Sequence, residues 1–549
     1  MEPARLKIVK ALEPTRPRIV VLPGERPWLI DGAEEAVLEN YARWGLFQPG
    51  DLLVRTTTLS AEDVEKEKLI RRKAGSVILR RATAPMLEDI FGRAIHWVVR
   101  VPDKDKVPGS FKDKVIDCPP KVAAIYLSRE GMWRLPRLTG IIEAPIMRPD
   151  GSVLTAPGYD EATGLLLQSP IAWPALPAPS KGAAEAAAKC LIEPFDEFPF
   201  SSRAGSSVLL SAMLTGLQRR LLPTAPAHAF DASIQAAGKT IQGDCVSLFL
   251  TGREIASMTF NSNEEEFRKK LMAGLVAGDA IFEIDNITKP LRSDTLASIL
   301  TKTLHSDRIM GLGENRSVPT NCLFILTGNN LQFSGDMPSR VISSRVEPDC
   351  ERPEERTFKI CNLRAHVLER RPQFVKAALT ILQSYFHAGR PPQGLKPFGR
   401  FEQWSDEIRS AIVWAGLPDP FLSRDEVIDA DPERDAALAV LENWFRVLAD
   451  AQTTIQALIR CATGHGMLGD HDFRPPDDEL KTALLGIAAD YECADKISSQ
   501  RLAAWCRDRV GRIFGEYKLV RSGKAHAGFQ TWQIVKLNKP TETIVTKEI

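Results

Sequence analysis

Gly238, Lys239 and Thr240 follow an apolar segment and a run of small residues, at a point where a helix is predicted to begin. Backbone N–H groups at a helix start bind phosphate oxygens, a lysine reaches the terminal phosphates of a nucleoside triphosphate, and a threonine hydroxyl is a ligand for Mg²⁺. Ala237 completes the predicted phosphate-binding loop. These residues predict a site for ATP, with Mg²⁺ held in part by Thr240.

The loop departs from the full phosphate-binding pattern at its start. The pattern has glycine six residues before the lysine, where this chain has Ser233, and Ala236 stands where a third small residue is often found. Both side chains are small, but neither has the freedom of glycine at positive φ. Taken alone, the Gly-Lys-Thr triplet is more typical of an exposed helix start than of a nucleotide site.

An apolar predicted strand further along the chain ends in Asp285. This is the usual position of a carboxylate that holds Mg²⁺. Asn286 follows it, where many ATPases have a glutamate that polarises water, and an amide cannot accept that proton. Glu283 lies on the same strand face as Asp285. It is therefore predicted as a substitute catalytic carboxylate, the alternative being a charge at the rim of the sheet.

A second predicted buried strand ends at Asn329, and two arginines, Arg340 and Arg345, follow it. An amide at the end of such a strand contacts the γ-phosphate and orients the attacking water, so Asn329 is predicted to serve both binding and catalysis. An arginine supplied across a subunit boundary stabilises charge on the transferring phosphoryl group. Either arginine is a candidate for that role, and the alternative is that both form surface ion pairs.

In this order the four elements resemble the ATPase core of superfamily 3 helicases, a branch of the AAA+ class, and most closely that of phage, plasmid and integrative-element primase-helicase proteins. The resemblance is collinear over roughly 190 residues, which single motifs do not reach by chance. It implies an ATP-dependent DNA helicase that assembles as a homo-hexamer around single-stranded DNA. The motifs that carry it are Ile284-Asp285-Asn286, Thr327-Gly328-Asn329-Asn330, Arg340 after Gly335-Asp336, and Pro353-Glu354-Glu355-Arg356.

Two short β-like runs around a Gly-x-Gly turn lie between Asp285 and Asn329. In superfamily 3 helicases a hairpin at this location projects into the central channel and grips single-stranded DNA. The resemblance implies this role for Arg316 first and for Arg308 second. The alternative is a surface hairpin in which Arg308 is structural.

Composition sets the outer limits of these predictions. A chain of 549 residues with 44% hydrophobic and 26% charged residues is predicted to form several globular domains. A net charge of +1 excludes a uniformly basic nucleic-acid coat, so DNA contacts require local patches. Nine cysteines without a Cys-x-x-Cys pair indicate reduced thiols and no zinc site. With no apolar run long enough for a membrane helix and no secretory signal, a cytoplasmic protein is expected.

The predicted fold is α/β, an AAA+ P-loop ATPase core with a parallel sheet, flanked by smaller modules. The N-terminal part shows no cluster of carboxylates for a two-metal primase centre, and Asp103-Lys104-Asp105 is predicted to be a charged surface loop. Priming is therefore expected from a separate primase. The expected domains are N-terminal α/β modules (1–168), a Pro-rich linker (169–182), the ATPase core (183–400), a helical lid (401–477) and a winged-helix-like DNA-binding domain (478–549).

The last of these modules has the order helix, helix, then two strands around Ser522-Gly523-Lys524. Residues 496–536 contain nine basic and two acidic side chains, a local net charge of +7. Such an excess fits binding to a phosphate backbone, and duplex DNA is the expected ligand. A solvated basic face is the alternative. The predicted DNA-binding residues are Gln500 and Arg501 at the helix start, Arg507 further along it, and Lys524 on the wing.

Two other functions are compatible with the same motifs. One is a DNA-binding initiator or scaffold whose nucleotide site has degenerated, which the substitutions in the loop and the missing glutamate after Asp285 suggest. The other is an AAA+ loader that hydrolyses ATP to remodel another helicase. Strand displacement that depends on Lys239 would distinguish the motor from both.

Overall fold

The computed structural model describes residues 16–66, 69–103, 110–308, 315–464, 475–491, 493–524 and 529–537. Contacts divide the chain into two compact units, which are described separately. The first comprises residues 1–289, 293–331 and 339–424, and the second comprises residues 290–292, 332–338 and 425–549.

The centre of the first unit is a five-stranded sheet in which every neighbouring pair is parallel. Its strand order is β13-β14-β17-β12-β18, so the parallel sheet predicted from the sequence is confirmed. Four of these strands are almost continuously buried, as expected where helices cover both faces of a parallel sheet. Their bounds are β12 Ala227–Ala232, β13 Ser257–Thr259, β14 Ile281–Ile287, β17 Leu323–Asn329 and β18 Val341–Val346.

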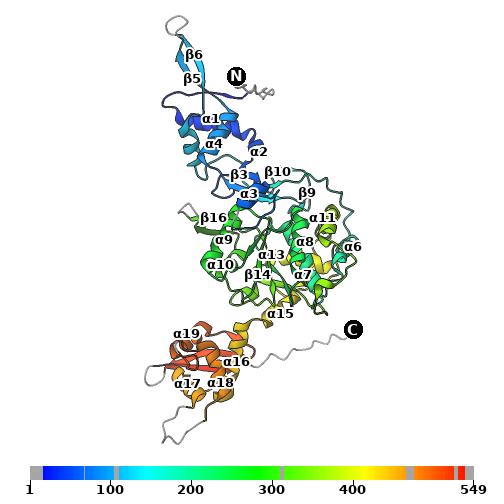
Figure 1. Cartoon of the computed structure of the whole chain (residues 1–549), viewed down its shortest axis with the longest axis vertical. Coiled ribbons are helices and arrows are strands. Elements are labelled where there is room, and N and C mark those ends of the chain that lie inside the picture. The colour runs from blue at the N-terminus through cyan, green and yellow to red at the C-terminus, as the bar shows by residue number, and fades with distance from the viewer. Residues whose placement is uncertain are drawn as a thin grey trace, which may run out of the picture. The chain divides into compact units, whose positions relative to one another are not determined.

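Helices pack around this sheet, and in the view of Figure 1 β14 lies between α9 and α10 on one side and α7 and α8 on the other. The helix over 264–277 has a clear signal at each end. Asn263 caps its start through the N–H groups of Glu265 and Glu266, and Gly278 ends it in the left-handed conformation. The helices are α6 Lys181–Ile192, α7 Gly205–Gln218, α8 Lys239–Thr251, α9 Glu264–Ala277, α10 Asp294–Leu300, α11 Leu363–Glu369 and α12 Arg371–His387.

A two-stranded antiparallel hairpin, β15 Leu304–Arg308 and β16 Asn315–Pro319, precedes β17. The Gly-x-Gly turn predicted between its strands falls at 309–314, outside the described residues. The short elements that follow β18 are η3 Pro353–Glu355, α13 Glu402–Trp404, η4 Ser405–Arg409, α14 Ser410–Trp414, η5 Pro420–Leu422 and α15 Ser423–Asp429, while η1 Glu193–Phe195 follows α6 and η2 Met337–Ser339 precedes β18.

The described residues of the N-terminal part of this unit contain three three-stranded sheets, β1-β5-β6, β2-β3-β4 and β10-β11-β7, and a hydrophobic cluster of their own. β8 and β9 form a two-stranded hairpin around residues 148–152. Asp103, predicted to lie in a surface loop, is buried and pairs with Lys112, and the two residues after it lie outside the described ones. The elements are β1 Arg18–Val20, α1 Arg26–Leu38, α2 Tyr41–Trp44, β2 Leu46–Phe47, β3 Val54–Thr58, α3 Ala61–Lys66, β4 Val77–Arg81, α4 Ala84–Ala94, β5 His96–Pro102, β6 Phe111–Ile116, α5 Pro120–Leu127, β7 Gly140–Ile142, β8 Ile146–Met147, β9 Val153–Leu154, β10 Gly158–Asp160 and β11 Leu165–Leu167.

The segment expected as one helical lid, 401–477, does not form a single body. Phe401, Trp404 and Phe421 join the hydrophobic core around the large sheet. Residues from Ala437 to Ala462 instead join the core of the second unit. The physical reason is the apolar face of each piece, which is buried against a different set of helices. The sequence boundary at 477 therefore does not match the division by contacts at 424/425.

The second unit packs four helices against a four-stranded sheet of order β19-β22-β21-β20. The two strands predicted around Ser522-Gly523-Lys524 are present, but these three residues do not form a turn between them. Those three residues belong to β21, with Gly523 at φ 131° beside a shift in strand register. The bounds are α16 Pro432–Leu448, β19 Thr453–Thr454, α17 Ile455–Thr463, α18 Asp478–Ala488, α19 Ser499–Arg509, β20 Ile513–Phe514, β21 Tyr517–Lys524 and β22 Gln530–Lys536.

Candidate nucleotide site and nucleic-acid contacts

The strand order gathers the predicted nucleotide residues at one edge of the sheet. β17 lies between β12 and β14, and its last residue, Asn329, pairs with Ala232 at the end of β12. Because the strands are parallel, the loop after β12, Asn329 and Asp285 on β14 all lie at the carboxyl edge. This edge is where open α/β sheets bind ligands.

Lys239 is the first residue of α8, and its Nζ donates a hydrogen bond to Oδ1 of Asn329. The side chain is partly buried, and this burial lowers the pKa of Lys239, while the nearby carboxylates of Asp285, Asp231 and Glu283 act in the opposite direction. The structure thus brings together the lysine and the amide that the sequence placed ninety residues apart. In this arrangement both side chains face the loop that Gly238 closes.

Asp285 is held by Thr327, the first residue of the Thr-Gly-Asn-Asn motif, to which the sequence analysis assigned no role. Oγ1 of Thr327 lies 2.8 Å from Oδ1 of Asp285 and 3.3 Å from Oε1 of Glu283, so one hydroxyl bridges the two carboxyl groups. Thr327 is buried on β17. The backbone N–H of Asn286 also donates to Oδ1 of Asp285, at 2.7 Å. These contacts fix the orientation of the Asp285 side chain.

Glu283 differs from Asp285 in its electrostatic state. It is 2% exposed, and burial, with the neighbouring charge of Asp285 second, raises its pKa to about 8. At neutral pH this side chain is therefore mostly protonated. A protonated carboxyl group cannot take a proton from water. Its geometry favours a structural role at the sheet, next to Gly243 of α8, over the catalytic one that the sequence suggested.

The loop itself contains two residues in the left-handed region, Ala236 at φ 60° and Gly238 at φ 101°. Ser233 is not among the residues with positive φ. Serine at the start of the loop is therefore accommodated without strain, whereas alanine at 236 is strained. At Gly238 a Cβ atom would lie 2.9 Å from Cε1 of Phe198, so only glycine fits.

We expect Ala236→Gly to raise the free energy of unfolding by about 1 kcal/mol, since the left-handed conformation costs an alanine roughly that much. The matched control is Ala237→Gly, because Ala237 has an ordinary φ. That change should lower stability by about 0.5–1 kcal/mol through the entropy of the unfolded chain. Thermal denaturation of both variants measures the difference, and equal shifts would contradict the assignment of strain.

A pocket of about 250 Å³ adjoins the loop. Phe198, Ile241, Phe358 and Leu363 give it apolar walls, and Arg356 lies at its side with its guanidinium over the Phe358 ring. Arg356 also donates to the carbonyl oxygen of Glu197. The Pro-Glu-Glu-Arg motif noted in the sequence thus lies beside the phosphate-binding loop. A planar base could bind between these walls while its phosphates reach Lys239.

The residues fit a magnesium ion that is held mainly by phosphate and water. Asp285 is a half-buried, oriented carboxylate, and Thr240 is exposed in the first turn of α8. Across the described residues there is no group of three or more His, Cys, Asp or Glu side chains that could hold a metal alone. Mg²⁺ typically uses one or two carboxylates together with substrate phosphates and water, so two protein ligands are sufficient.

Arg340 and Arg345, the two candidates for an arginine finger supplied across a subunit boundary, are held within their own chain. Arg345 donates to Oδ2 of buried Asp231, to Oε1 of Glu347 and to Oδ1 of Asn330. Arg340 is 6% exposed. The alternative of surface ion pairs describes Arg345 only in part, because Glu347 is exposed but Asp231 is a buried residue of β12.

The two hairpin arginines occupy different environments. Arg308 is exposed at the end of β15 and makes no ion pair with a described residue. Arg316 on β16 is 11% exposed, and both its terminal nitrogens lie 2.7 Å from the carboxylate oxygens of Glu130. The sequence ranked Arg316 above Arg308 as a contact for single-stranded DNA. In the structure Arg308 is the more accessible of the two, because Arg316 is paired with Glu130.

The residues predicted to bind DNA in the second unit also differ in how accessible their side chains are. Arg507 is exposed on α19, and Gln500 is exposed at its start. Arg501 instead donates to the carbonyl oxygen of Ala489 and lies 4.6 Å above the Tyr491 ring, so it is used within the fold. Lys524 ends β21, and its side chain is outside what the structure describes.

Sequence reasoning assigned no role to Thr327, Asp231 or Glu130, each of which holds a predicted site residue. Thr327 stands two residues before Asn329 on the same strand face, which was an available signal. Asp231 and Glu130 are 114 and 186 residues from their arginine partners, and no local pattern connects residues at such separations.

No protein-family model matches the chain, and no curated protein sequence matches it. Among solved structures it is similar to the apo C-terminal region of NrS-1, with 10% identity, 91% of this chain and 98% of the other covered, and a TM-score of 0.35. It is also similar to an SCCmec type IV Cch described as an active helicase, with 12% identity, 80% and 90% coverage, and a TM-score of 0.32. JCV helicase gives 14% identity, 46% and 73% coverage, and a TM-score of 0.20. Two of these three structures are of helicases.

Among the described helices, none has both the length and the apolar character required to cross a membrane.

Proposed function

We propose that this chain is the ATP-driven motor of a DNA helicase, a ring-forming superfamily 3 member of the AAA+ class that serves replication of a phage or other mobile element. The observation that carries the proposal is the meeting of Lys239, Asn329 and Asp285 at the carboxyl edge of one parallel sheet. The collinear motifs support the narrower class. ATP and Mg²⁺ are the proposed ligands, and a cytoplasmic location follows from this role.

In the proposed site the phosphates bind the N–H groups at the start of α8. The Lys239 ammonium, which bonds Asn329 in the absence of phosphate, turns to the terminal phosphates. The freed Asn329 amide then faces the γ-phosphate and positions water. When bound, Mg²⁺ neutralises charge on the phosphate oxygens, and Thr240 and Asp285 would hold it. Phe198 and Phe358 would enclose the base.

Glu283 has no direct catalytic part in this scheme. Its carboxyl group is protonated at neutral pH and shares the Thr327 hydroxyl with Asp285. It would thus act by keeping Asp285 oriented.

We propose a homo-hexamer in which nucleotide lies between neighbouring copies, as the resemblance implies. The arginine supplied by the next copy would be Arg340 or Arg345. The ion pair of Arg345 with Asp231 and the burial of Arg340 do not favour that assignment. Arg345 could reach a neighbour only by leaving Asp231. Its hydrogen bond to Asp231 better supports a cis role, that is, a role within its own chain, in which Arg345 holds Asp231 in place. A separate primase remains a proposed partner.

Single-stranded DNA is the proposed ligand of the β15–β16 hairpin, with Arg308 making the first contact. Arg316 would join after release from Glu130, since phosphate and carboxylate compete for the same guanidinium. The second unit, proposed as winged-helix-like, would supply a further DNA contact near Arg507.

We expect Glu130→Gln to raise the affinity for single-stranded DNA by about fivefold, because an exposed ion pair that competes with DNA is worth at most ~1 kcal/mol. The hydrogen bonds from Arg316 lower the pKa of Glu130, so the carboxylate is charged and the pair is formed at neutral pH. Fluorescence anisotropy at low salt measures the change. Glu35→Gln is the matched control, because Glu35 is an exposed partner of Arg134 on the same part of the chain. Unchanged affinity in Glu130→Gln, or an equal rise in the control, would show that Glu130 does not compete with DNA for Arg316.

A DNA-binding scaffold with a non-hydrolysing site is the second candidate. It is favoured by the absence of an ionised carboxylate after Asp285, where Asn286 stands, and by the protonated state of Glu283. Such a protein would bind ATP and DNA without turnover. An AAA+ loader would hydrolyse ATP and displace no strand by itself.

The deciding experiment measures particle size, ATP hydrolysis and strand displacement of the purified chain, each with and without single-stranded DNA. The motor predicts a multimer with DNA-stimulated hydrolysis and displacement of a labelled strand. Hydrolysis without displacement would indicate the loader. Binding of ATP and DNA without hydrolysis would replace the motor by the scaffold.

A further inference from the structure

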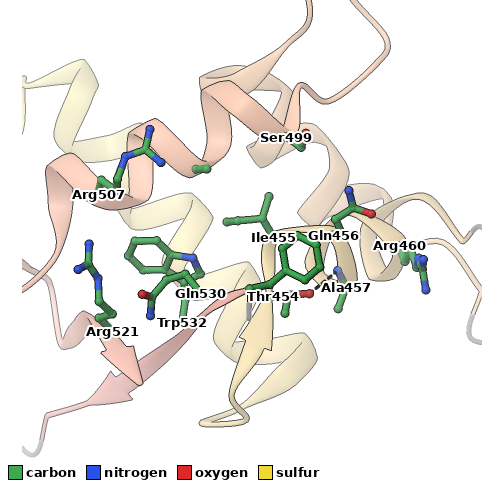
Figure 2. Close-up of a pocket in the computed structure, with 12 residues that line it drawn as sticks. Thr454, Ile455, Gln456, Ala457, Arg460, Ser499, Arg507, Arg521, Gln530 and Trp532 are labelled. Atoms are coloured by element: carbon green, nitrogen blue, oxygen red, sulfur yellow. Dashed lines mark hydrogen bonds between the residues drawn. The ribbon is translucent and has the colours of Figure 1, made fainter. Parts of the chain in front are cut away.

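A second cavity lies within the second unit. It is a groove of about 630 Å³ between the start of α17, one face of α19 and the strands β21 and β22. Figure 2 shows its labelled side chains converging from these elements, with Arg507 on α19 and Arg521 on β21 on either side of the Trp532 indole. The twelve lining residues are Thr454, Ile455, Gln456, Ala457, Arg460, Ser499, Ala503, Arg507, Arg521, Phe529, Gln530 and Trp532.

The groove is positively charged and has no acid in its lining. Arg460, Arg507 and Arg521 are all exposed, and none of them makes an ion pair with any residue that the structure describes. Two other arginines of this unit do form ion pairs, Arg446 with Asp477 and Arg509 with Glu433. Three such guanidinium groups around one concave surface are placed to bind a chain of phosphates.

The groove also presents a surface for a planar ring. Phe529 is 63% exposed, although a large aromatic side chain is normally buried. It stands just before β22, whose residues Gln530 and Trp532 share the lining. Gln456 brings an amide donor and an acceptor to the same space, whereas the amide nitrogen of Gln530 already donates to the carbonyl oxygens of Gly523 and Thr531. Arginines for phosphates together with an exposed aromatic for bases are the features of a single-strand nucleic-acid site.

The shape decides against a duplex in this groove. A helix that reads duplex DNA must project into a major groove about 12 Å wide. Here Ser499, Ala503 and Arg507, four residues apart on one face of α19, form the wall of a concavity that α17 closes on the other side. This face of α19 therefore cannot enter the major groove of a duplex. A single strand is narrow enough to lie along the wall, with its bases turned toward Phe529.

We propose that this groove binds single-stranded nucleic acid, with phosphates on Arg460, Arg507 and Arg521 and a base stacked on Phe529. The proposal extends the DNA contact suggested for the second unit and does not depend on nucleotide hydrolysis. The groove would hold a separated strand independently of the hairpin in the first unit.

The test is fluorescence anisotropy of the full chain with a labelled twelve-nucleotide oligothymidylate, without ATP or Mg²⁺. The double variant Arg507→Ala and Arg521→Ala should weaken binding at least about tenfold, and the slope of log affinity against log salt should become shallower by about 1.4, or about 0.7 for each phosphate that is no longer neutralised. Phe529→Ala should weaken binding by about five- to a hundredfold with the salt slope unchanged, because stacking is not ionic. Phe529→Tyr, which keeps a stacking ring, should restore the affinity.

The double variant Lys496→Ala and Arg512→Ala is the charge-matched control, since both residues are exposed in the same unit and neither lines the groove. It should change affinity less than about twofold. An equal loss of affinity in this control would show a diffuse basic face and overturn the proposal. Tighter binding of a twelve-base-pair duplex, with the same loss in the arginine variant and none in Phe529→Ala, would overturn it in favour of duplex binding. Lys239→Ala should bind the oligonucleotide as the unaltered chain does, so a failed motor and a failed groove give separate results.

Discussion

Replacing Lys239 with alanine is expected to lower the rate of ATP hydrolysis by about a hundredfold or more. Removing one preorganised group that stabilises transition-state charge has an effect of about 10²–10³ in rate. Here the lysine is also the partner of Asn329, so its loss removes two aligned groups together. The measurement is steady-state phosphate release at saturating DNA, with a melting curve to confirm that the fold is intact.

The melting temperature of this variant should stay close to that of the unaltered chain. Burial lowers the pKa of Lys239, which means that the folded protein disfavours its charge and loses little when the side chain is removed. Lys189→Ala, on the exposed side of α6, is the control and should leave both hydrolysis and melting unchanged. If Lys239→Ala hydrolyses ATP at a rate within about fivefold of that of the unaltered chain, this loop does not take part in the reaction.

The second large effect is expected at Arg345. Arg345→Ala should lower the free energy of unfolding of the first unit by about 3–5 kcal/mol, because it leaves Asp231 as a buried carboxylate without its cation. Asp231 is 5% exposed, and its burial already raises its pKa in the presence of Arg345. Thermal melting should show a fall of several degrees, whereas Arg352→Ala, which removes an exposed pair with Glu355, should show none.

This variant also separates the cis role of Arg345 from a finger role toward a neighbour. In the cis role, adding Asp231→Asn to Arg345→Ala should restore most of the lost stability, because the unpaired charge is then gone. In the finger role, Arg345→Ala would melt normally and hydrolyse slowly. Mixing it with Lys239→Ala would then recover activity, since each mixed interface could combine one intact loop with one intact arginine.

Much of the core could be predicted because its signals are local. β12, β14 and β17 are short apolar runs that end in Ala232, Asp285 and Asn329, and parallel pairing must bring such ends to one edge. The helix at 264–277 carries its own cap and terminating glycine. The roles of Asp285, Asn329 and the loop residues remain predictions, now with a geometry that supports them.

The parts that could not be predicted depend on distant partners. Nothing near Arg345 or Arg316 in the sequence indicates Asp231 or Glu130, and the ion pairs decide how available each arginine is. The lid was mispredicted for a related reason, since the helical periodicity of 401–424 and of 432–462 is similar and does not say which core each face will join. Strand β21 was mispredicted because Ser522-Gly523 is turn chemistry that tertiary pairing overrides.

The contact between Gly238 and Phe198 has a consequence for affinity. The Phe198 ring fills the space where a side chain at 238 would stand, so the loop is already braced on that side before any ligand arrives. Ordering a flexible loop on binding consumes part of the interaction free energy, and a loop fixed during folding avoids that loss. The shape of the loop proposed to bind phosphate is thus fixed in advance by an aromatic ring forty residues earlier in the sequence.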